Sequence, residues 1–494
     1  MNFIKAKSKS KLILALLIGL APLNAMVMPG AKAAESESFR LKPPTLPAPR
    51  PFVLPKVKTF KLDNGLEVKF LEDHRFPVVT ACLGIRSGKI LDQDESQGIA
   101  KLTATMLTEG TEKRTSKEIA NEIDYIGGSL GASCDYDFTL ISGSCLSNYT
   151  PRLMSLFQDV ALHPNFPDEE MKLKKTNWLQ ELILQRAEPS YLLEERFRHV
   201  IFGANPYGRV SPKPSMIEKI SKEDLRKFHS ENYIPNNSLL LVVGDFDPNA
   251  MESTIRDSFG KDWARGEIKG STLASTSPVN NQKIYLVNRP GSVQSSIKLG
   301  NLGIKKTDPD YFKILVMNDV LGGSAHSRLF ENIRESKGYT YGAYSSSAAR
   351  VHPDVFSAQS DVRTEVTAPA LQEFLYELDR IRNVKVNQEE LDSAKSYLAG
   401  LFQLRLETQS GLAQALLDAG LYNMPDDYLE NYTKNIMAVT VDDVRKVARR
   451  VISSGKFVIT VVGDAKKIQP DLEMFAPVEV YSVDGKLSTS DSHI

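Results

Sequence analysis

The sequence predicts an α+β protein made of two tandem homologous domains, each an antiparallel sheet with helices packed on one face. The first observation is length, because 494 residues exceed one typical core and imply two or more domains. The second is an internal repeat, in which residues 221–245 align with residues 440–464 without a gap. The third is the order of the patterns, since strands, then helices, then further strands occur in each copy.

The repeat is specific because identities and apolar positions stay in step over a whole helix, loop and strand. Seven of the 25 aligned positions are identical, at a constant offset of 219. The identical positions are Asp224 and Asp443, Arg226 and Arg445, Lys227 and Lys446, and the closing Val-Val-Gly-Asp of each copy. A duplicated domain explains this pattern.

The N-terminus has the pattern of a secretory signal peptide. Four Lys between positions 5 and 11 precede the apolar run Leu12 to Leu20, and a small-residue site follows at Ala31-Lys32-Ala33. The alternative is an uncleaved membrane anchor, but Pro22 and Asn24 interrupt the apolar stretch before it reaches the roughly 18 residues of a membrane helix. We therefore expect export to the periplasm, cleavage near Ala33 and no stable membrane insertion.

Charge and cysteine content exclude some functions. The formal net charge is +0, and residues 1–33 contribute five Lys and no acid, so the rest of the chain carries −5, which argues against nucleic acid as a partner. Cys82, Cys134 and Cys145 cannot all pair, and their spacing has no C-x-x-C pattern typical of zinc or redox sites. We expect all three to be small buried hydrophobes.

The elements of the first domain follow a Pro-rich arm at residues 34–57, which is either a tether or a docking segment. An Asn-Gly turn within residues 60–68 predicts a hairpin, and a strand follows at 78–85. Residues 116–126 have the pattern of an amphipathic helix with a Ser cap, and residues 129–145 alternate as a second hairpin.

A helix is predicted over residues 98–111, between the strand and the amphipathic helix. At 100° per residue its positions separate into two opposite faces. One face holds Ile99, Leu102 and Met106, and the other holds Lys101, Ala104 and Thr105.

A long helical pattern runs from Pro167 toward Phe202 and carries Glu181 on its first half. Pro189 interrupts it, because proline lacks an amide hydrogen and its ring clashes with the preceding turn. Residues rich in Gly, Ser, Thr and Asn then separate the two domains. The predicted boundaries are signal peptide 1–33, arm 34–57, first domain 58–265, linker 266–282, second domain 283–480 and tail 481–494.

The helix at 98–111 has the frame of a known catalytic motif. With its neighbours it resembles G-x-A-H-x-x-E-H-M-L-x-x-G-T of the pitrilysin-type zinc peptidases, the group of the mitochondrial processing peptidase. The resemblance covers about Val57 to Ile468. It implies that the chain is half of a clamshell that two such subunits close in the two-chain branch of the family.

The resemblance also shows what the motif has lost. Lys101 and Thr105 stand where the family has its two zinc-binding His, and Ala104 stands where it has the Glu that activates water. Glu181 lies 76 residues after Thr105, close to the family's third zinc ligand. The chain has seven His, the nearest two 26 residues apart, so no local pair replaces the motif. We expect this chain to bind no cofactor.

The second copy retains a different part of the family pattern. Residues 321–344 resemble the family's C-domain signature and contain Arg334 and Tyr341 with R-x₆-Y spacing. In active relatives such a pair hydrogen-bonds the scissile carbonyl as negative charge develops on it. The resemblance therefore implies a non-catalytic subunit that binds peptides and completes the site of a homologous partner, which carries H-x-x-E-H and the zinc. The alternative is a structural or peptide-binding protein without a role in proteolysis.

One contact can be predicted for the vacated motif. If Glu181 packs near Lys101, the ammonium would supply the positive charge that zinc supplies in the family. We expect the two charged groups to lie within about 6 Å of each other.

Overall fold

The computed structural model describes residues 52–270, 273, 276 and 281–488, all of which lie in one compact unit. The predicted signal peptide, most of the Pro-rich arm, part of the predicted linker and the end of the tail lie outside these residues. None of the helices in the described ranges is long and apolar enough to span a membrane.

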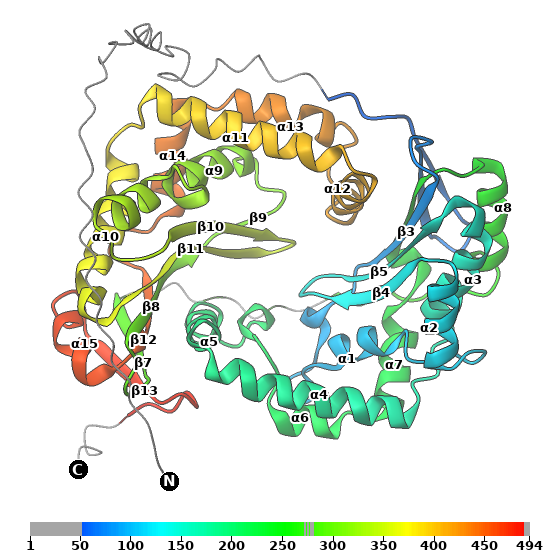
Figure 1. Cartoon of the computed structure of the whole chain (residues 1–494), viewed down its shortest axis with the longest axis horizontal. Coiled ribbons are helices and arrows are strands. Elements are labelled where there is room, and N and C mark those ends of the chain that lie inside the picture. Colours follow the sequence, from blue (N-terminus) through cyan, green and yellow to red (C-terminus); the bar gives the residue numbers. More distant parts are fainter. Residues whose placement is uncertain (1–51, 271–272, 274–275, 277–280, 489–494) are drawn as a thin grey trace, which may run out of the picture. The chain divides into compact units, whose positions relative to one another are not determined.

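The first domain contains a six-stranded sheet in the order β1-β2-β6-β3-β5-β4 (Figure 1). The hairpins predicted from the sequence are both present, and Gly65 takes the positive φ of +95° that the turn between β1 and β2 requires. The strands are β1 (Val57–Lys61), β2 (Glu67–Glu72), β3 (Val78–Ile85), β4 (Ser129–Cys134), β5 (Thr139–Leu146) and β6 (Ser238–Gly244).

Helices of the same domain cover one face of this sheet and enclose a core with it. Pro189 separates α4 from α5, as predicted. The predicted amphipathic helix begins at Ser116, as expected, but its cap is Thr115 rather than Ser116, and Thr115 forms a capping box with Glu118. The helices are α1 (Ile99–Met106), α2 (Ser116–Tyr125), α3 (Thr150–Leu162), α4 (Asp168–Ala187), α5 (Pro189–Phe202), α6 (Pro214–Lys219), α7 (Lys222–Asn232) and α8 (Pro248–Phe259).

The second domain contains a seven-stranded sheet in the order β13-β7-β12-β8-β11-β10-β9, with its own helices over one face. Its strands are β7 (Lys283–Asn288), β8 (Gln294–Leu302), β9 (Ile304–Lys305), β10 (Ala343–Arg350), β11 (Pro353–Arg363), β12 (Val458–Gly463) and β13 (Val478–Tyr481). Its helices are α9 (Tyr311–Asn318), the π-helical turns η6 (Asp319–Gly323) and η7 (Phe330–Ser336), α10 (Thr367–Asn383), α11 (Gln388–Leu406), α12 (Gln409–Leu421), α13 (Tyr428–Met437), α14 (Val441–Val451) and α15 (Ala465–Leu472).

The α+β prediction is confirmed, and the sheets prove to be mixed rather than purely antiparallel. β2 pairs with β6 in parallel, and β12 pairs with β7 in parallel. The reason is topological, because the last long strand of each domain returns to the sheet after helical crossovers, whereas a hairpin would return antiparallel. The sequence pattern identified the strands but did not reveal this pairing.

The internal repeat corresponds to the same local structure in both domains. α7 leads to β6 as α14 leads to β12, and the helices begin at equivalent positions. Both start with a capping box, from Ser221 to Asp224 and from Thr440 to Asp443. The identical Asp residues of the repeat are therefore the capping residues.

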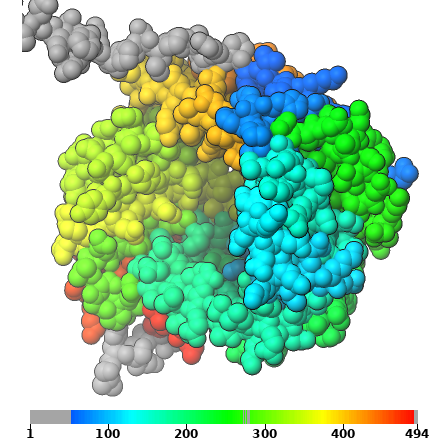
Figure 2. All heavy atoms as spheres, turned by 45° about the vertical axis from the view of Figure 1, so that its right-hand side comes forward, coloured from blue at the N-terminus to red at the C-terminus, as the bar shows by residue number. Residues whose placement is uncertain are grey.

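Each domain sends one helix to the other domain's sheet (Figure 1). α12 packs on the face of the first sheet that lies opposite its own helices, and α5 packs on the corresponding face of the second sheet. In Figure 2 the golden surface around residues 400–420 adjoins the blue surface of the first strands. We call this arrangement the helix exchange.

The described end of the arm lies against this chain's own second domain. The ring of Phe52 packs edge-on against Phe402 of α11, and the Leu54 amide donates to Glu430 of α13 at 3.4 Å. The three Cys are free thiols, with Cys82 and Cys145 buried and Cys134 partly buried.

Candidate functional site

The helix α1 is held at its N-terminus by a buried carboxylate. Asp92 accepts hydrogen bonds from the amides of Gly98, at 2.7 Å, and Ala100, at 3.0 Å. Gly98 has φ +98°, and a Cβ there would lie 2.7 Å from the Trp178 ring, so only glycine fits. Burial raises the pKa of Asp92 to about 6 although both amides oppose the shift.

The vacated motif positions do not share one open face. Ile99, Leu102 and Met106 of the one face are buried, but Ala104 of the opposite face is fully buried as well. The Thr105 hydroxyl donates to the carbonyl of Leu102 at 3.0 Å, so it is bound to its own helix. Of the three vacated positions, Lys101 is the one whose side chain lines a cavity.

The predicted contact between Lys101 and Glu181 is present. Lys101 Nζ lies 3.8 Å from Glu181 Oε2, and Gln185 donates to the other carboxylate oxygen at 2.8 Å. The reason for expecting the contact needs correction, because the Glu181 side chain is 52% exposed and carries no buried charge. The pair is therefore a weak ion pair at an open surface.

Lys101 is otherwise held by an aromatic ring. Its Nζ lies 4.5 Å from the centre of the Trp178 ring. Partial burial lowers the pKa of Lys101, Glu181 raises it, and repulsion by Lys89 lowers it further.

Zinc does not fit these residues. Tetrahedral zinc needs thiolate, imidazole or carboxylate ligands, whereas Lys101 is a cation, Ala104 has no donor atom, and the Thr105 hydroxyl is engaged. In the described part of the chain, no three His, Cys, Asp or Glu side chains gather in a way that could hold a metal. The absence of a zinc requirement stays a prediction.

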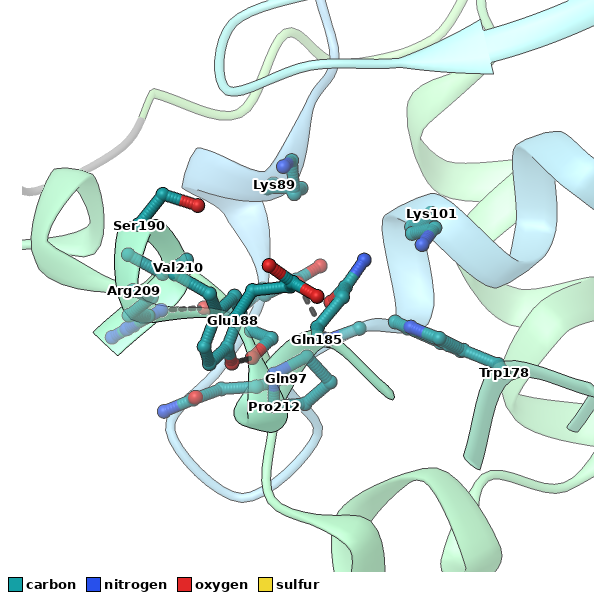
Figure 3. Close-up of a pocket in the computed structure, with 14 residues that line it drawn as sticks. Lys89, Gln97, Lys101, Trp178, Gln185, Glu188, Ser190, Arg209, Val210 and Pro212 are labelled. Atoms are coloured by element: carbon teal, nitrogen blue, oxygen red, sulfur yellow. Dashed lines mark hydrogen bonds between the residues drawn. The ribbon is translucent and has the colours of Figure 1, made fainter. Parts of the chain in front are cut away.

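A cavity of about 410 Å³ opens beside Lys101. Figure 3 shows Lys101 next to the edge of Trp178, with Gln185 and Glu188 across the cavity and Lys89 above them. Arg209 forms part of the wall, where it donates to the Asp92 carbonyl at 2.7 Å and pairs with Asp94. Ser190, at the start of α5, closes another side.

Arg334 and Tyr341 belong to consecutive segments of the second domain. Arg334 lies in η7, where it pairs with Glu335 at 2.9 Å and covers the Phe330 ring. Tyr341 lies in the loop two residues before β10 and not on the strand itself.

Tyr341 is 91% exposed, and its hydroxyl has no hydrogen-bond partner among the described residues. It lines a second hollow, of about 620 Å³, together with Lys298, Gln359 and Ser190. Ser190 therefore lies between the two hollows, at the first turn of α5. The hollow beside Lys101 and the hollow beside Tyr341 therefore adjoin each other at the N-terminal end of α5.

Several residues of the site were not found from the sequence. Trp178 and Gln185 fall three residues before and four residues after the predicted Glu181 on α4, so helical spacing could have grouped them with it. Asp92 and Lys89 lie in an irregular segment without such periodicity. The tertiary fold of that segment, rather than a sequence pattern, places Lys89 and Asp92 next to α1.

The fold and the site define a two-domain α+β protein of the peptidase type with a degenerate metal motif. Residues 68–215 match the family model described as insulinase (peptidase family M16), and residues 219–398 match that of the peptidase M16 inactive domain. The chain belongs to the M16 peptidase family, also called the insulinase or pitrilysin family.

Curated relatives include an uncharacterized zinc protease of Streptomyces coelicolor, 25% identical over 74% of this chain and 80% of that protein. Another, from Bacillus subtilis, is 22% identical over 80% of this chain and 96% of that protein. Among solved structures, a peptidase M16 inactive domain from Pseudomonas fluorescens has a TM-score of 0.77 and 27% identity. The match covers 82% of this chain and 98% of that chain.

Proposed function

We propose that this chain is the non-catalytic subunit of an exported heteromeric zinc endopeptidase. Its partner is a homologous subunit with an intact H-x-x-E-H motif, which holds the zinc and the general base. This chain contributes a wall of the chamber and the pair Arg334 and Tyr341. The observation that carries the proposal is Tyr341, which is 91% exposed and whose hydroxyl has no hydrogen-bond partner among the described residues, in a chain whose own motif lacks the family's catalytic groups.

The chemistry of the pair suits the role. A guanidinium and a phenol are donors, and peptide hydrolysis places negative charge on the scissile carbonyl oxygen in the transition state. The Arg334 side chain is 41% exposed, and within the described ranges it pairs with the adjacent Glu335 alone, so its other donors are accessible to a substrate. A large aromatic side chain exposed to this extent also suits contact with another molecule.

The partner is required by what α1 lacks. A zinc peptidase supplies a Lewis acid and an activated water, and Lys101, Ala104 and Thr105 can supply neither. The names of the relatives as zinc proteases support a place for this chain in proteolysis. Export rests on the predicted signal peptide, and the site of action would be the periplasm.

The test is reconstitution of the pair with two variants. Tyr341→Phe deletes one hydroxyl, and Arg334→Ala deletes the guanidinium. We expect each to lower peptide turnover by about 10²- to 10³-fold. Since the charge exists mainly in the transition state, the loss should appear in kcat more than in KM.

The controls separate catalysis from assembly. Tyr376, on α10, is 55% exposed, and Tyr376→Phe makes the same chemical change away from the pair. Complex formation and the zinc content of the partner should be unchanged in all three variants. Turnover equal to that of wild type in both Tyr341→Phe and Arg334→Ala would remove the pair from catalysis.

The second candidate function is a structural or peptide-binding protein without a role in proteolysis. The Lys101–Glu181 pair favours it, because this contact within the chain gives both residues a partner without a second subunit. A gene for a similar exported protein with intact H-x-x-E-H next to this one would favour the first candidate. Peptide binding without any cleavage by the reconstituted pair would favour the second.

A further inference from the structure

The cavity beside Lys101 holds two ammonium groups that the protein leaves incompletely neutralised. Lys89 has no ion-pair partner in the described part of the chain, and its Nζ lies 4.7 Å from the centre of the Tyr136 ring. Lys101 has one ion pair, at 3.8 Å, with a half-exposed carboxylate. Neither Nζ donates a hydrogen bond to another described residue, so all three donors of each ammonium remain available.

The two ammonium groups are close enough to act together. Repulsion by Lys89 contributes to the lowered pKa of Lys101, which places them within electrostatic range of each other. Both line the same cavity of about 410 Å³, and both lie against aromatic rings that exclude water from one side. A bound anion would relieve the repulsion and accept hydrogen bonds from both groups.

The acids of the cavity do not replace such an anion. Asp92 attracts Lys89 electrostatically, but it is buried, forms no ion pair with Lys89 and already accepts from two amides of α1. Glu188 is exposed at the N-terminal end of α5 and forms no ion pair among the described residues. Glu188 therefore repels a bound anion. Removal of its charge should strengthen anion binding, whereas removal of a lysine charge should weaken it.

We propose that the cavity of Lys89 and Lys101 binds a carboxylate group of a peptide. This inference rests on the proposed function for its ligand class, because that function makes peptides the molecules that enter the chamber. Ser190 is shared with the hollow of Tyr341, so one extended peptide could lie along the start of α5 and contact both. The vacated metal position would then anchor substrate by charge.

A peptide carboxylate has two sources, the C-terminus and the side chains of Asp and Glu. Three short acetylated peptides of Gly, Ser, Ala and Leu distinguish them. The first has a free C-terminal acid, the second is amidated, and the third is amidated and contains one internal Glu. Binding is measured to the whole protein, expressed with its native N-terminus.

The structure provides its own reporter. The chain has two Trp, and Trp178 forms a wall of the cavity whereas Trp263 is buried elsewhere. A Trp263→Phe background leaves Trp178 as the fluorescent group, and the peptides contain no Trp. The change of its emission on titration gives the Kd, and isothermal calorimetry on the unmodified protein checks it.

We expect the free acid or the Glu peptide to bind and the amidated neutral peptide to bind at least about tenfold more weakly. Lys89→Gln and Lys101→Gln should each weaken the binding of the tighter carboxylate peptide by about the same factor. Lys117→Gln, an exposed lysine of α2, makes the same charge change and should have no effect. Glu188→Gln should tighten binding.

Two outcomes would overturn the proposal. One is equal binding of all three peptides, and the other is absence of binding by both carboxylate peptides to a protein with wild-type thermal unfolding. The Tyr341→Phe variant keeps the two proposals apart. If its turnover with the partner is unchanged while carboxylate binding still depends on Lys89, the catalytic role fails and the carboxylate site stands.

Discussion

Asp319 is a buried acid that lacks a hydrogen-bond donor among the described residues. Its carboxylate lies in the π-helical turn η6, is 5% exposed, and accepts no hydrogen bond from the other described residues. Burial raises its pKa to about 7, far above the ordinary value of 3.8. The protonated acid is therefore favoured in the folded chain, and ionisation near neutral pH costs stability.

The sign of the pH dependence follows from this pKa. Because the folded state holds the Asp319 proton more tightly than the unfolded state, the stabilising contribution is present below about pH 4 and lost as the pH rises through about 7. Asp319→Asn should abolish this pH-dependent loss of stability. In the wild-type protein we expect the loss to lower the free energy of unfolding by on the order of a few kcal/mol between those two pH values. Urea unfolding of both proteins across this range measures the difference, and parallel pH profiles would contradict the expectation.

A second prediction at the residue scale concerns metal. The protein alone should contain much less than one zinc per chain and should cleave no peptide, because Lys101, Ala104 and Thr105 offer no ligand. Metal analysis after dialysis and a chelator-treated peptide assay check it. Stoichiometric zinc with chelator-sensitive cleavage by the isolated chain would contradict it.

The site was partly predictable for a physical reason. Lys101 and Glu181 were predicted to meet because the family resemblance places both at positions of one zinc site, although they lie on different helices. Lys89 and Asp92 were not predicted, since an irregular segment has no periodicity from which to infer direction. The burial of Ala104 depends on neighbouring elements that its own helix does not specify.

At the scale of the element, the helix exchange is what fastens the two domains to each other. Leu421, at the end of α12, is 2% exposed and packs against the first domain, where its side chain fills the space above Gly84. Arg86 of the first domain donates to the carbonyls of Gly420, at 2.9 Å, and Leu421, at 3.3 Å. The guanidinium thereby caps the C-terminus of α12.

Leu421→Ala should destabilise the protein by about 2 to 5 kcal/mol, because it removes buried methyl groups and leaves a cavity between the domains. Leu404 is a matched control, since it lies near the end of the preceding helix and is 63% exposed. Leu404→Ala should change stability by no more than about 0.5 kcal/mol. Urea unfolding measures both, and similar losses would show that α12 is not an energetic link.

The helices and strands were more predictable than their packing. Strand β3 occupies the predicted residues 78–85, and the break at Pro189 separates α4 and α5, because local chemistry decides both. The parallel pairing of β2 with β6 and the exchange of α5 and α12 depend on contacts between residues far apart in the sequence. Local sequence patterns do not determine such contacts. Apolar residues on both faces of β6 indicate that both faces are covered but not which helix covers them.

At the scale of the whole molecule, a buried charge network crosses between the domains. Arg198 of α5 lies 3.0 Å from Asp354 of β11, and Arg350 donates to the same carboxylate at 2.7 Å. Asp354 is fully buried and Arg198 nearly so. Charges this deep are tolerated only with their partners, so the network requires the two domains to meet in one arrangement.

Asp354→Ala should destabilise the protein by about 1 to 3 kcal/mol, because it removes the buried acceptor shared by the two guanidinium groups. The loss is limited because Arg198 keeps its ion pair with Glu194, and Arg350 keeps its ion pair with Asp135. Arg198→Ala should also be destabilising, and the double variant should lose less than the sum of the two. A double-mutant cycle from denaturant unfolding gives the coupling energy, expected at about 0.5 to 3 kcal/mol. Strict additivity would mean that the pair does not join the domains.

The helix exchange also limits how the chain can be divided. Either half produced alone would expose to water the apolar residues that α12 or α5 covers in the whole chain. We therefore expect each half in isolation to associate with another molecule or to aggregate, and the two halves mixed together to recover the soluble protein by covering each other's sheets.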